Sequence, residues 1–170
     1  IKDKVIYING FSKMFSMTGL RVGYFACCKD IMNELMKVHQ YNVSCAASIS
    51  QYAAYEGLRN GLDEVRYMKS IFNSRKEYVT KRLTDMKLNV VIPKGAFYVF
   101  PSIKEFNMSS EEFAMRLLTE EKVACVPGNA FGIGGEGYIR ISYCNSNEEL
   151  KMGLDGIERF INKLRKAISN

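Results

Sequence analysis

The strongest constraint on the fold is a long amphipathic stretch at residues 62–86. Its apolar residues recur at spacings of three, four or seven, so they form one stripe along an α-helix. The stripe consists of Val65, Met68, Phe72, Val79, Leu83 and Met86. A helix of this length extends about 37 Å, which is enough to connect two lobes. The pattern alone is equally compatible with a solitary helix in one core.

The segments on either side of this stretch follow different patterns, which predicts two parts. Before it, the sequence indicates strands over 4–9 and 21–27 with a loop between them, and helices over 30–40 and 48–59. After it, the sequence indicates strands over 90–93, 96–100, 123–127 and 137–143, and helices over 111–121 and 147–168. Ser109 and Ser146, each followed three residues later by glutamate, predict the starts of the last two helices. We therefore expect an α/β fold with domains at 1–74 and 75–170, divided within the long helix.

Composition narrows the class of protein. Of the 170 residues, 47% are apolar and 25% are charged, as in soluble globular proteins. No run approaches the roughly 20 apolar residues of a membrane span. The five cysteines include no C-x-x-C pair, so we expect buried free thiols and a reducing, cytoplasmic location. The only histidine, His39, cannot build a metal site by itself.

The net charge of +6 raises the question of nucleic-acid binding. Basic residues are dispersed, apart from a run at the end of the last predicted helix, where cations offset the helix macrodipole. We therefore expect neither a nucleic-acid nor a membrane partner. The sequence also lacks an initiator methionine and opens almost directly into a strand pattern, so we expect a fragment or a processed piece.

A basic pair flanks the first predicted loop. Lys13 follows the strand that ends at Asn9, and Arg21 begins the next strand. Ligands of open α/β sheets bind outside the carboxyl ends of strands, and two neighbouring strands would bring Lys13 and Arg21 together. Converging cations indicate an anion, and a nearby cation favours the neutral, nucleophilic form of an amine. These properties suit a lysine that forms a Schiff base beside a phosphate, although such residues are also common on ordinary surfaces.

Arg140 is a second candidate, because it lies in the middle of the predicted strand 137–143. One face of that strand carries Ile139, Ile141 and Tyr143, and the other carries Tyr138, Arg140 and Ser142. An arginine in this position is either a charge at the edge of a sheet or a fixed fork for a carboxylate, which guanidinium donors match bidentately. The pattern leaves both interpretations open.

A glycine-rich run at residues 132–137 matches G-x-G-x-x-G. The dinucleotide-binding fingerprint follows a strand and opens a helix, whereas this run leads into a strand. We therefore predict a flexible loop at this position.

Four segments, taken in order, resemble the class I/II aminotransferases, which are the aspartate-aminotransferase-like enzymes of fold type I that use pyridoxal 5'-phosphate (PLP). The segment NGFSKMFSMTGLRVGY is similar to the lysine motif of that family, in which S-K is followed by G-x-R-x-G-Y. PKGAFYVFP, VPGNAFG and GYIRISY resemble three later blocks, so the resemblance spans nearly the whole chain. It implies the last strands of a large-domain sheet, a long connecting helix and a smaller α+β C-terminal domain. It also implies transfer of an amino group between an amino acid and a 2-oxo acid.

The resemblance assigns roles by matched position. Lys13 resembles the lysine that forms a Schiff base with the cofactor aldehyde and then transfers a proton. Arg21 resembles the arginine that holds the cofactor phosphate, and Ser12, which lies beside the lysine, is expected to assist in binding the cofactor. Arg140 resembles the arginine that binds the α-carboxylate of the substrate. Gly10 stands where many relatives have a hydroxyl residue, so one phosphate contact of the family is missing from this pattern.

The family resemblance also implies what the chain requires from elsewhere. The groups that contact the cofactor ring precede the lysine in the family, and only twelve residues precede Lys13 here. We therefore expect a C-terminal portion that is inactive by itself, and the resemblance implies a homodimer. A PLP-dependent lyase of the same fold and a non-catalytic binding or assembly module remain alternatives. The motifs do not specify the amino donor.

Overall fold

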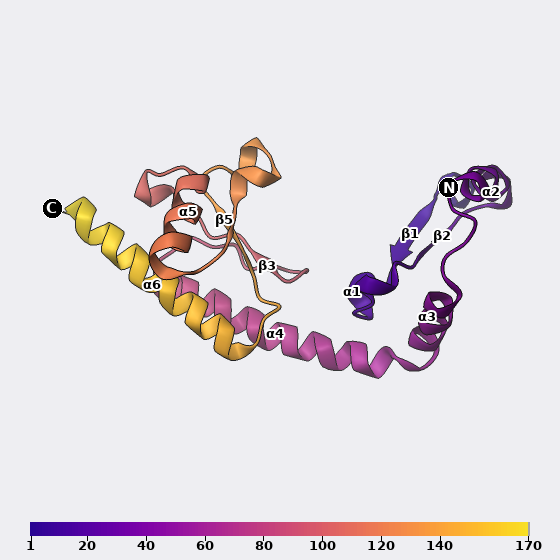
Figure 1. Ribbon diagram of the computed structural model, residues 1–170, viewed down its shortest axis with the longest axis horizontal. Coiled ribbons are helices and arrows are strands. Elements are labelled where there is room, and N and C mark those ends of the chain that lie inside the picture. Colours follow the sequence, from indigo (N-terminus) through magenta and orange to yellow (C-terminus); the bar gives the residue numbers. More distant parts are fainter. Residues whose placement is uncertain (170) are drawn as a thin grey trace. The chain divides into compact units, whose positions relative to one another are not determined.

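The computed structural model describes residues 1–169 and divides into two compact units, Ile1–Lys69 and Ser70–Asn170. The division falls inside helix α4 (Leu62–Asp85), which is the long helix that the apolar stripe predicts (Figure 1). Each unit has its own hydrophobic cluster. The interpretation of this stretch as a connecting helix is therefore confirmed.

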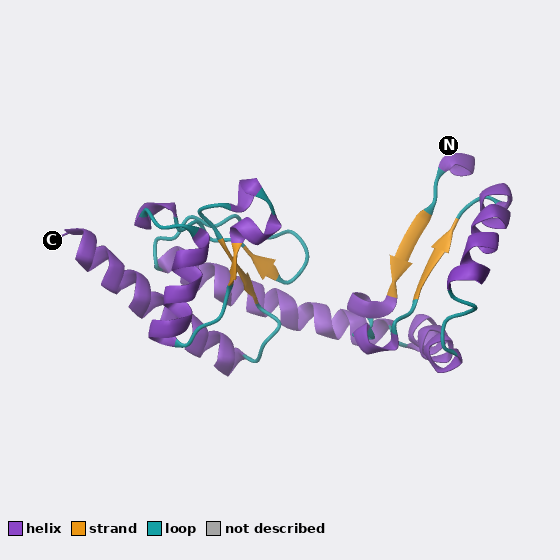
Figure 2. Cartoon of the chain, turned by 45° about the horizontal axis from the view of Figure 1, so that its top comes forward, coloured by secondary structure: helices purple, strands orange, loops and turns teal. Residues whose placement is uncertain are grey.

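The first unit is built around a two-stranded ribbon. Its elements before α4 are η1 (Lys2–Lys4), β1 (Tyr7–Gly10), α1 (Phe11–Met14), η2 (Thr18–Leu20), β2 (Gly23–Ala26), α2 (Lys29–Asn42) and α3 (Ser48–Asn60), where η denotes a 3-10 helix. β1 and β2 are antiparallel, with Tyr7 opposite Ala26 and Gly10 opposite Gly23 (Figure 2). The loop predicted between the two strands is wrong in part, because α1 and η2 lie within it. The Phe15 N–H donates to the Phe11 carbonyl at 3.2 Å and closes the first helical turn after β1.

The core of the first unit is small. Its buried members are Phe11, Val22 and Ala54, and four partly buried residues pack against them: Phe15, Met17, Leu20 and Ala46. All four residues of β1 are exposed. The loop after β1 is thus anchored by Phe11 just beyond one strand and by Val22 just before the other.

The second unit contains a three-stranded antiparallel sheet in the order β3-β5-β4. Its elements after α4 are β3 (Tyr98–Val99), η3 (Lys104–Phe106), α5 (Ser110–Glu121), β4 (Val126–Pro127), η4 (Gly128–Phe131), η5 (Ile133–Gly135), β5 (Ile139–Ser142) and α6 (Asn147–Ser169). Its core joins the sheet to the helices, because Val99 and Ile139 share one buried cluster with residues of α4, α5 and α6.

The strands of the second unit are shorter than predicted. Residues 90–93 form no strand, and Val90 makes only an isolated bridge to Pro101. The strand predicted over 96–100 keeps two residues, because Ala96 has a φ of 59°, which lies outside the extended region. The strand predicted over 123–127 likewise keeps only its last two residues.

Local signals in the helices of the second unit are confirmed. The Glu112 N–H donates to Ser109 Oγ at 3.1 Å and caps α5. The cap of α6 is reciprocal, since the Glu149 N–H donates to Ser146 Oγ at 3.2 Å and the Ser146 N–H donates to Glu149 Oε2 at 3.0 Å. The stripe of α6 is buried except at Ile168, which is 59% exposed. Its buried members are Leu150, Leu154, Ile157, Ile161 and Leu164.

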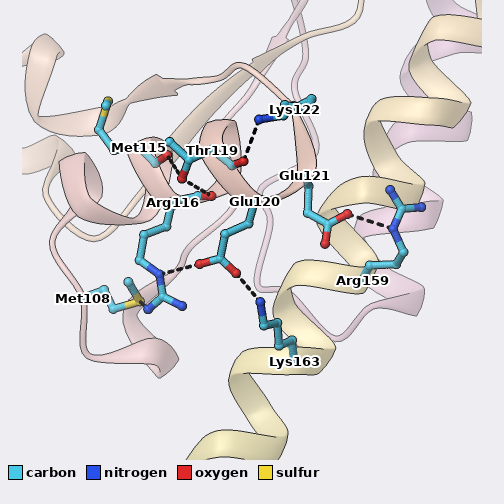
Figure 3. Close-up of polar contacts among 9 residues, drawn as sticks. All are labelled: Met108, Met115, Arg116, Thr119, Glu120, Glu121, Lys122, Arg159 and Lys163. Carbon is cyan, nitrogen blue, oxygen red and sulfur yellow. Dashed lines mark hydrogen bonds and ion pairs between the residues drawn. The ribbon is translucent and has the colours of Figure 1, made fainter.

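Ion pairs link α5 to α6 at the surface (Figure 3). Glu120 accepts a hydrogen bond from Lys163 of α6 and another, at 2.9 Å, from Arg116 of its own helix. These two cations hold the pKa of Glu120 below its usual range. Glu121 accepts a bond from Arg159 of α6 at 2.8 Å. These surface pairs accompany the packing of α6, whose buried stripe lies in the core of the second unit.

All five cysteines are free, as predicted, but the expectation that they are buried is wrong. Cys45 and Cys144 are exposed because they lie in loops, and the others are half-buried. Burial raises the pKa of the Cys125 thiol to about 11. Within residues 1–169, no group of three ligating side chains could hold a metal ion. No helix in that range is long and apolar enough to cross a membrane.

Candidate active site

The loop that carries Lys13 joins the two strands of the ribbon at one end. β1 ends at Gly10 and β2 begins at Gly23, and these two residues are paired. A Cβ atom at position 23 would lie 3.0 Å from the Asn9 carbonyl oxygen, so the close approach favours glycine there. β1 and β2 are antiparallel neighbours. Lys13, which follows β1, and Arg21, which precedes β2, therefore lie at the same end of the ribbon, as predicted for neighbouring strands.

Three side-chain hydrogen bonds close this loop. Thr18 Oγ1 donates to the Ser12 carbonyl at 3.0 Å, and Arg21 Nη1 donates to the Thr18 carbonyl at 2.9 Å. Ser50 of α3, which is 3% exposed, donates its hydroxyl to the Leu20 carbonyl at 2.7 Å. The backbone between Ser12 and Arg21 therefore has a fixed path.

The backbone of Arg21 is strained. It ends η2 with φ 50° and ψ 48°, a left-handed conformation. This conformation costs a non-glycine residue about 1–2 kcal/mol, and such strain persists only where the surrounding structure determines it. Here the bond to Thr18 and the paired strands provide that surrounding structure.

The functional groups on this loop differ in exposure. Lys13 and Arg21 are exposed, and Ser12 is half-buried. An amine, a guanidinium and a hydroxyl on one closed loop form a donor set for a ligand that combines a carbonyl group with a phosphate.

Arg140 lies on β5, the middle strand of the second unit's sheet. The alternative of a charge at a sheet edge is therefore wrong, because β3 and β4 pair with β5 on its two sides. Its neighbours on the opposite face, Ile139 and Tyr143, are only 0% and 1% exposed. The guanidinium carbon of Arg140 lies 4.3 Å from the ring centroids of both Tyr98 and Phe131. Tyr98 belongs to β3 and Phe131 to η4, which directly follows β4.

Arg140 differs from the other half-buried arginines that stack on a ring in the second unit. Three of them also pair with a carboxylate: Arg82 with Asp155, Arg116 with Glu120, and Arg165 with Glu105. Another, Arg75, donates to the Cys144 carbonyl at 2.9 Å. For Arg140, no carboxylate or carbonyl acceptor is found within residues 1–169. Its stacked guanidinium therefore has donors that can take an external anion.

The glycine-rich run before β5 forms a compact turn. Gly128 and Gly135 approach so closely that a Cβ on either one would overlap the other's carbonyl oxygen. Gly132 has a φ of 109° and Gly137 a φ of 81°, both in the region that favours glycine. The run leads into a strand as predicted, but part of the predicted loop forms the 3-10 helix η5. Phe131, at the end of η4, contacts Arg140 across this turn.

The structure groups the predicted residues in two sets. Ser12, Lys13 and Arg21 share the loop of the first unit, and Arg140 belongs to the second unit. The sequence patterns did not indicate Thr18 and Ser50, which hold the loop closed. They also did not indicate Tyr98 and Phe131, which contact Arg140. The sequence did contain a hint of the two rings. Tyr98 lies in the family-like segment PKGAFYVFP, and Phe131 lies in the family-like segment VPGNAFG.

Comparisons with known proteins identify the family of this chain. The family model described as "Aminotransferase class I and II" matches residues 2–157. The chain is 51% identical over 168 residues to the probable N-acetyl-LL-diaminopimelate aminotransferase of Bacillus subtilis, covering 99% of this chain and 43% of that protein. It is 44% identical to the aspartate aminotransferase of Pyrococcus abyssi, covering 94% of this chain and 41% of that protein. A solved aromatic aminotransferase from Pyrococcus horikoshii superimposes with a TM-score of 0.90 at 40% identity, over 96% of this chain and 44% of that one.

The chain therefore belongs to the class I and II aminotransferases, a fold-type I family whose members depend on PLP. It spans about two fifths of the length of the curated relatives it matches, at 43% and 41% for the two above. Its fold is the predicted part of a fold-type I transferase, with two large-domain strands, a connecting helix and an α+β unit. The donor set on the loop of the first unit fits PLP, which carries an aldehyde and a phosphate.

Proposed function

We propose that this chain supplies the cofactor-binding lysine loop and the substrate-binding arginine of an aminotransferase that exchanges an amino group between an amino acid and a 2-oxo acid. In this proposal residues 1–74 are part of the PLP-binding domain and residues 75–170 form the small domain. The observation that carries it is the closed loop between β1 and β2, which holds an amine and a guanidinium at one end of the ribbon. The unusual surroundings of Arg140 support the second half of the proposal.

Each residue has a distinct role in this proposal. Bound PLP supplies an electron sink for the negative charge that develops at the substrate α-carbon. Lys13 would bind the cofactor aldehyde through Nζ and would move a proton at the α-carbon. Arg21 would hold the phosphate, and the Ser12 hydroxyl would donate to it. Arg140 would orient the substrate by its α-carboxylate, because its planar donors match two carboxylate oxygens.

The test is chemical labelling of the lysine. The protein is incubated with PLP, reduced with borohydride and digested, and the modified peptides are mapped. Borohydride converts a lysine–PLP linkage into a stable amine, so the label reports the bound position directly. We expect modification at Lys13, and its loss in Lys13→Ala. Lys29→Ala is a matched control, because Lys29 is another exposed lysine of the same unit.

Two results would contradict the proposed role of Lys13. One is labelling that is scattered over surface lysines in the full protein. The other is labelling that persists at the wild-type level in the Lys13→Ala variant. If Lys13 is labelled, product analysis with and without a 2-oxo acid acceptor distinguishes an aminotransferase from a lyase. Product formation that does not need the acceptor would favour the lyase.

The proposal also covers what the 170 residues do alone. In the family the groups that contact the cofactor ring precede the lysine, so we expect no transamination by residues 1–170 without them. Turnover by purified material of this length, free of any longer form, would contradict this. The family resemblance implies a homodimer, which sedimentation of the full protein tests.

A further inference from the structure

Arg140 is held by two aromatic rings that come from opposite sides of its strand. Tyr98 belongs to β3 and is paired with Ser142 of β5. Phe131 ends η4, which follows β4, the neighbour of β5 on its other side. Both ring centroids lie 4.3 Å from the guanidinium carbon, well within the range of a cation–π contact.

The ring of Phe131 is only partly buried. Phe131 is 50% exposed, so it gains only part of the stabilisation that a buried phenylalanine provides. It sits in a turn whose path is set by the close approach of Gly128 and Gly135. The turn therefore requires glycine at these two positions, and it places a half-exposed ring against the Arg140 guanidinium.

Both rings are themselves supported. Phe131 makes an edge contact with Phe100 at 5.5 Å between centroids. Tyr98 contacts Phe97 at 4.6 Å. The backbone of Phe97 is fixed in turn, because its carbonyl accepts a bond from the Tyr143 N–H at 3.0 Å. The two rings therefore have defined positions before any ligand arrives.

We propose that Tyr98 and Phe131 are positioning residues that hold the Arg140 guanidinium for a substrate carboxylate. The inference rests on the proposed function, in which Arg140 binds that carboxylate. Stacking occupies the faces of a guanidinium and leaves its N–H groups free, because those groups lie in its plane. The rings would also restrict the rotamers of a long side chain before binding and shield the faces of the guanidinium from water.

The test compares a carboxylate with its neutral amide in the full protein loaded with PLP. The probes are butanoate and butanamide, measured as competitive inhibitors at constant ionic strength. The ratio of their inhibition constants reports the interaction of Arg140 with the negative charge, and a general loss of packing does not move this ratio. The KM and kcat for an amino-acid substrate are measured in parallel.

The variants separate the effect of the two rings, Tyr98 and Phe131, which together form an aromatic clamp, from the effect of Arg140 itself. Arg140→Ala should abolish the preference for butanoate. Phe131→Leu and Tyr98→Leu should each reduce it roughly threefold to tenfold, the range expected for loss of one cation–π contact. In both, KM should rise by more than kcat falls, whereas Tyr98→Phe keeps the ring and should keep the preference. Tyr138→Leu is the control, since Tyr138 lies on the same strand face but its ring contacts Lys104.

The outcomes distinguish failure of this inference from failure of the proposed function. Wild-type preference in both leucine variants, with loss in Arg140→Ala, overturns the clamp and leaves the role of Arg140 standing. Wild-type preference in Arg140→Ala overturns the role of Arg140 and the clamp together. Because Phe131 is half-exposed, Phe131→Leu remains a valid test even where Tyr98→Leu does not fold.

Discussion

At the scale of single residues, Arg21 combines backbone strain with the side chain that is proposed to hold the cofactor phosphate. Its left-handed φ would suit glycine, yet the position carries a guanidinium that bonds to the Thr18 carbonyl. The proposed function gives a reason for keeping arginine at this strained position, namely its side chain. Two substitutions that both delete the guanidinium, but differ in their backbone preference, separate the role of the side chain in cofactor binding from the effect of backbone strain on stability.

We predict that Arg21→Gly is more stable than Arg21→Ala although both lose PLP affinity. Alanine keeps the strain of about 1–2 kcal/mol, whereas glycine relieves it and loses about 0.5–1 kcal/mol in chain entropy, so the net difference is about 1 kcal/mol. Amide hydrogen exchange of β1 and β2 measures the stability. Loss of a charged hydrogen bond to phosphate should weaken PLP binding roughly tenfold or more, as measured by titration.

The control for Arg21 is Arg59→Ala, which removes an exposed arginine from α3 in the same unit. This variant should bind PLP as the wild type does. Equal stability of Arg21→Gly and Arg21→Ala would show that the backbone at this position is not strained.

At the scale of elements, a reciprocal cap between Ser146 and Glu149 begins α6. This cap makes the stability of the helix depend on pH. The N–H and hydroxyl groups of Ser146 both donate to Glu149 and hold the pKa of its carboxyl below the usual range. A carboxyl with a lower pKa in the folded state stabilises the fold above its unfolded pKa. That contribution is lost as the pH falls through the folded value.

We predict that Glu149→Gln flattens the acid destabilisation of the second unit below about pH 4.3, the ordinary glutamate value. Ser146→Ala should flatten it too, and should also lower stability at neutral pH by about 1 kcal/mol through loss of the cap. Urea unfolding followed by circular dichroism between pH 7 and pH 3 measures both effects. Glu148→Gln changes an exposed glutamate of the same turn and is the control. If Glu149→Gln followed the wild-type pH dependence, the cap would not be the source.

At the scale of the whole molecule, the two units have very different cores. The cluster of the second unit contains 17 buried residues, and that of the first contains three. Buried apolar area is the main source of stability, so the second unit should be much the more stable of the two.

We predict that Phe113→Ala destabilises the second unit by about 3–5 kcal/mol, the usual cost of truncating a buried phenylalanine. Phe113 is 0% exposed, and its ring meets Phe160 and Phe106 at centroid distances of 5.0 and 5.6 Å. Hydrogen exchange should accelerate in α5, α6 and β5 while exchange in β1 and β2 stays at its wild-type rate. Met115→Ala is the control, because Met115 lies on the same helix and is 55% exposed. Equal acceleration in both units would show that they unfold together.

The helices and caps of this protein could be predicted because their signals are local. The stripe of α4, the stripe of α6 and the serine–glutamate pairs are all formed by residues within one or two turns of each other. The family-like segments identified Lys13, Arg21 and Arg140 as candidates for the same reason, since each motif is continuous in the sequence. How these residues act on cofactor and substrate stays a prediction.

The sequence by itself determined the longer helices, the caps of α5 and α6, and the positions of the candidate residues. Only the tertiary structure decided where the strands end, that Arg140 lies on a middle strand, and which rings surround it. Tyr98 and Phe131 reach Arg140 through the pairing of β3 and β4 with β5, across gaps of many residues. The physical reason is that a strand has no internal hydrogen bonds. Its limits and its neighbours are therefore set by distant segments of the chain, whereas a helix is closed by its own sequence.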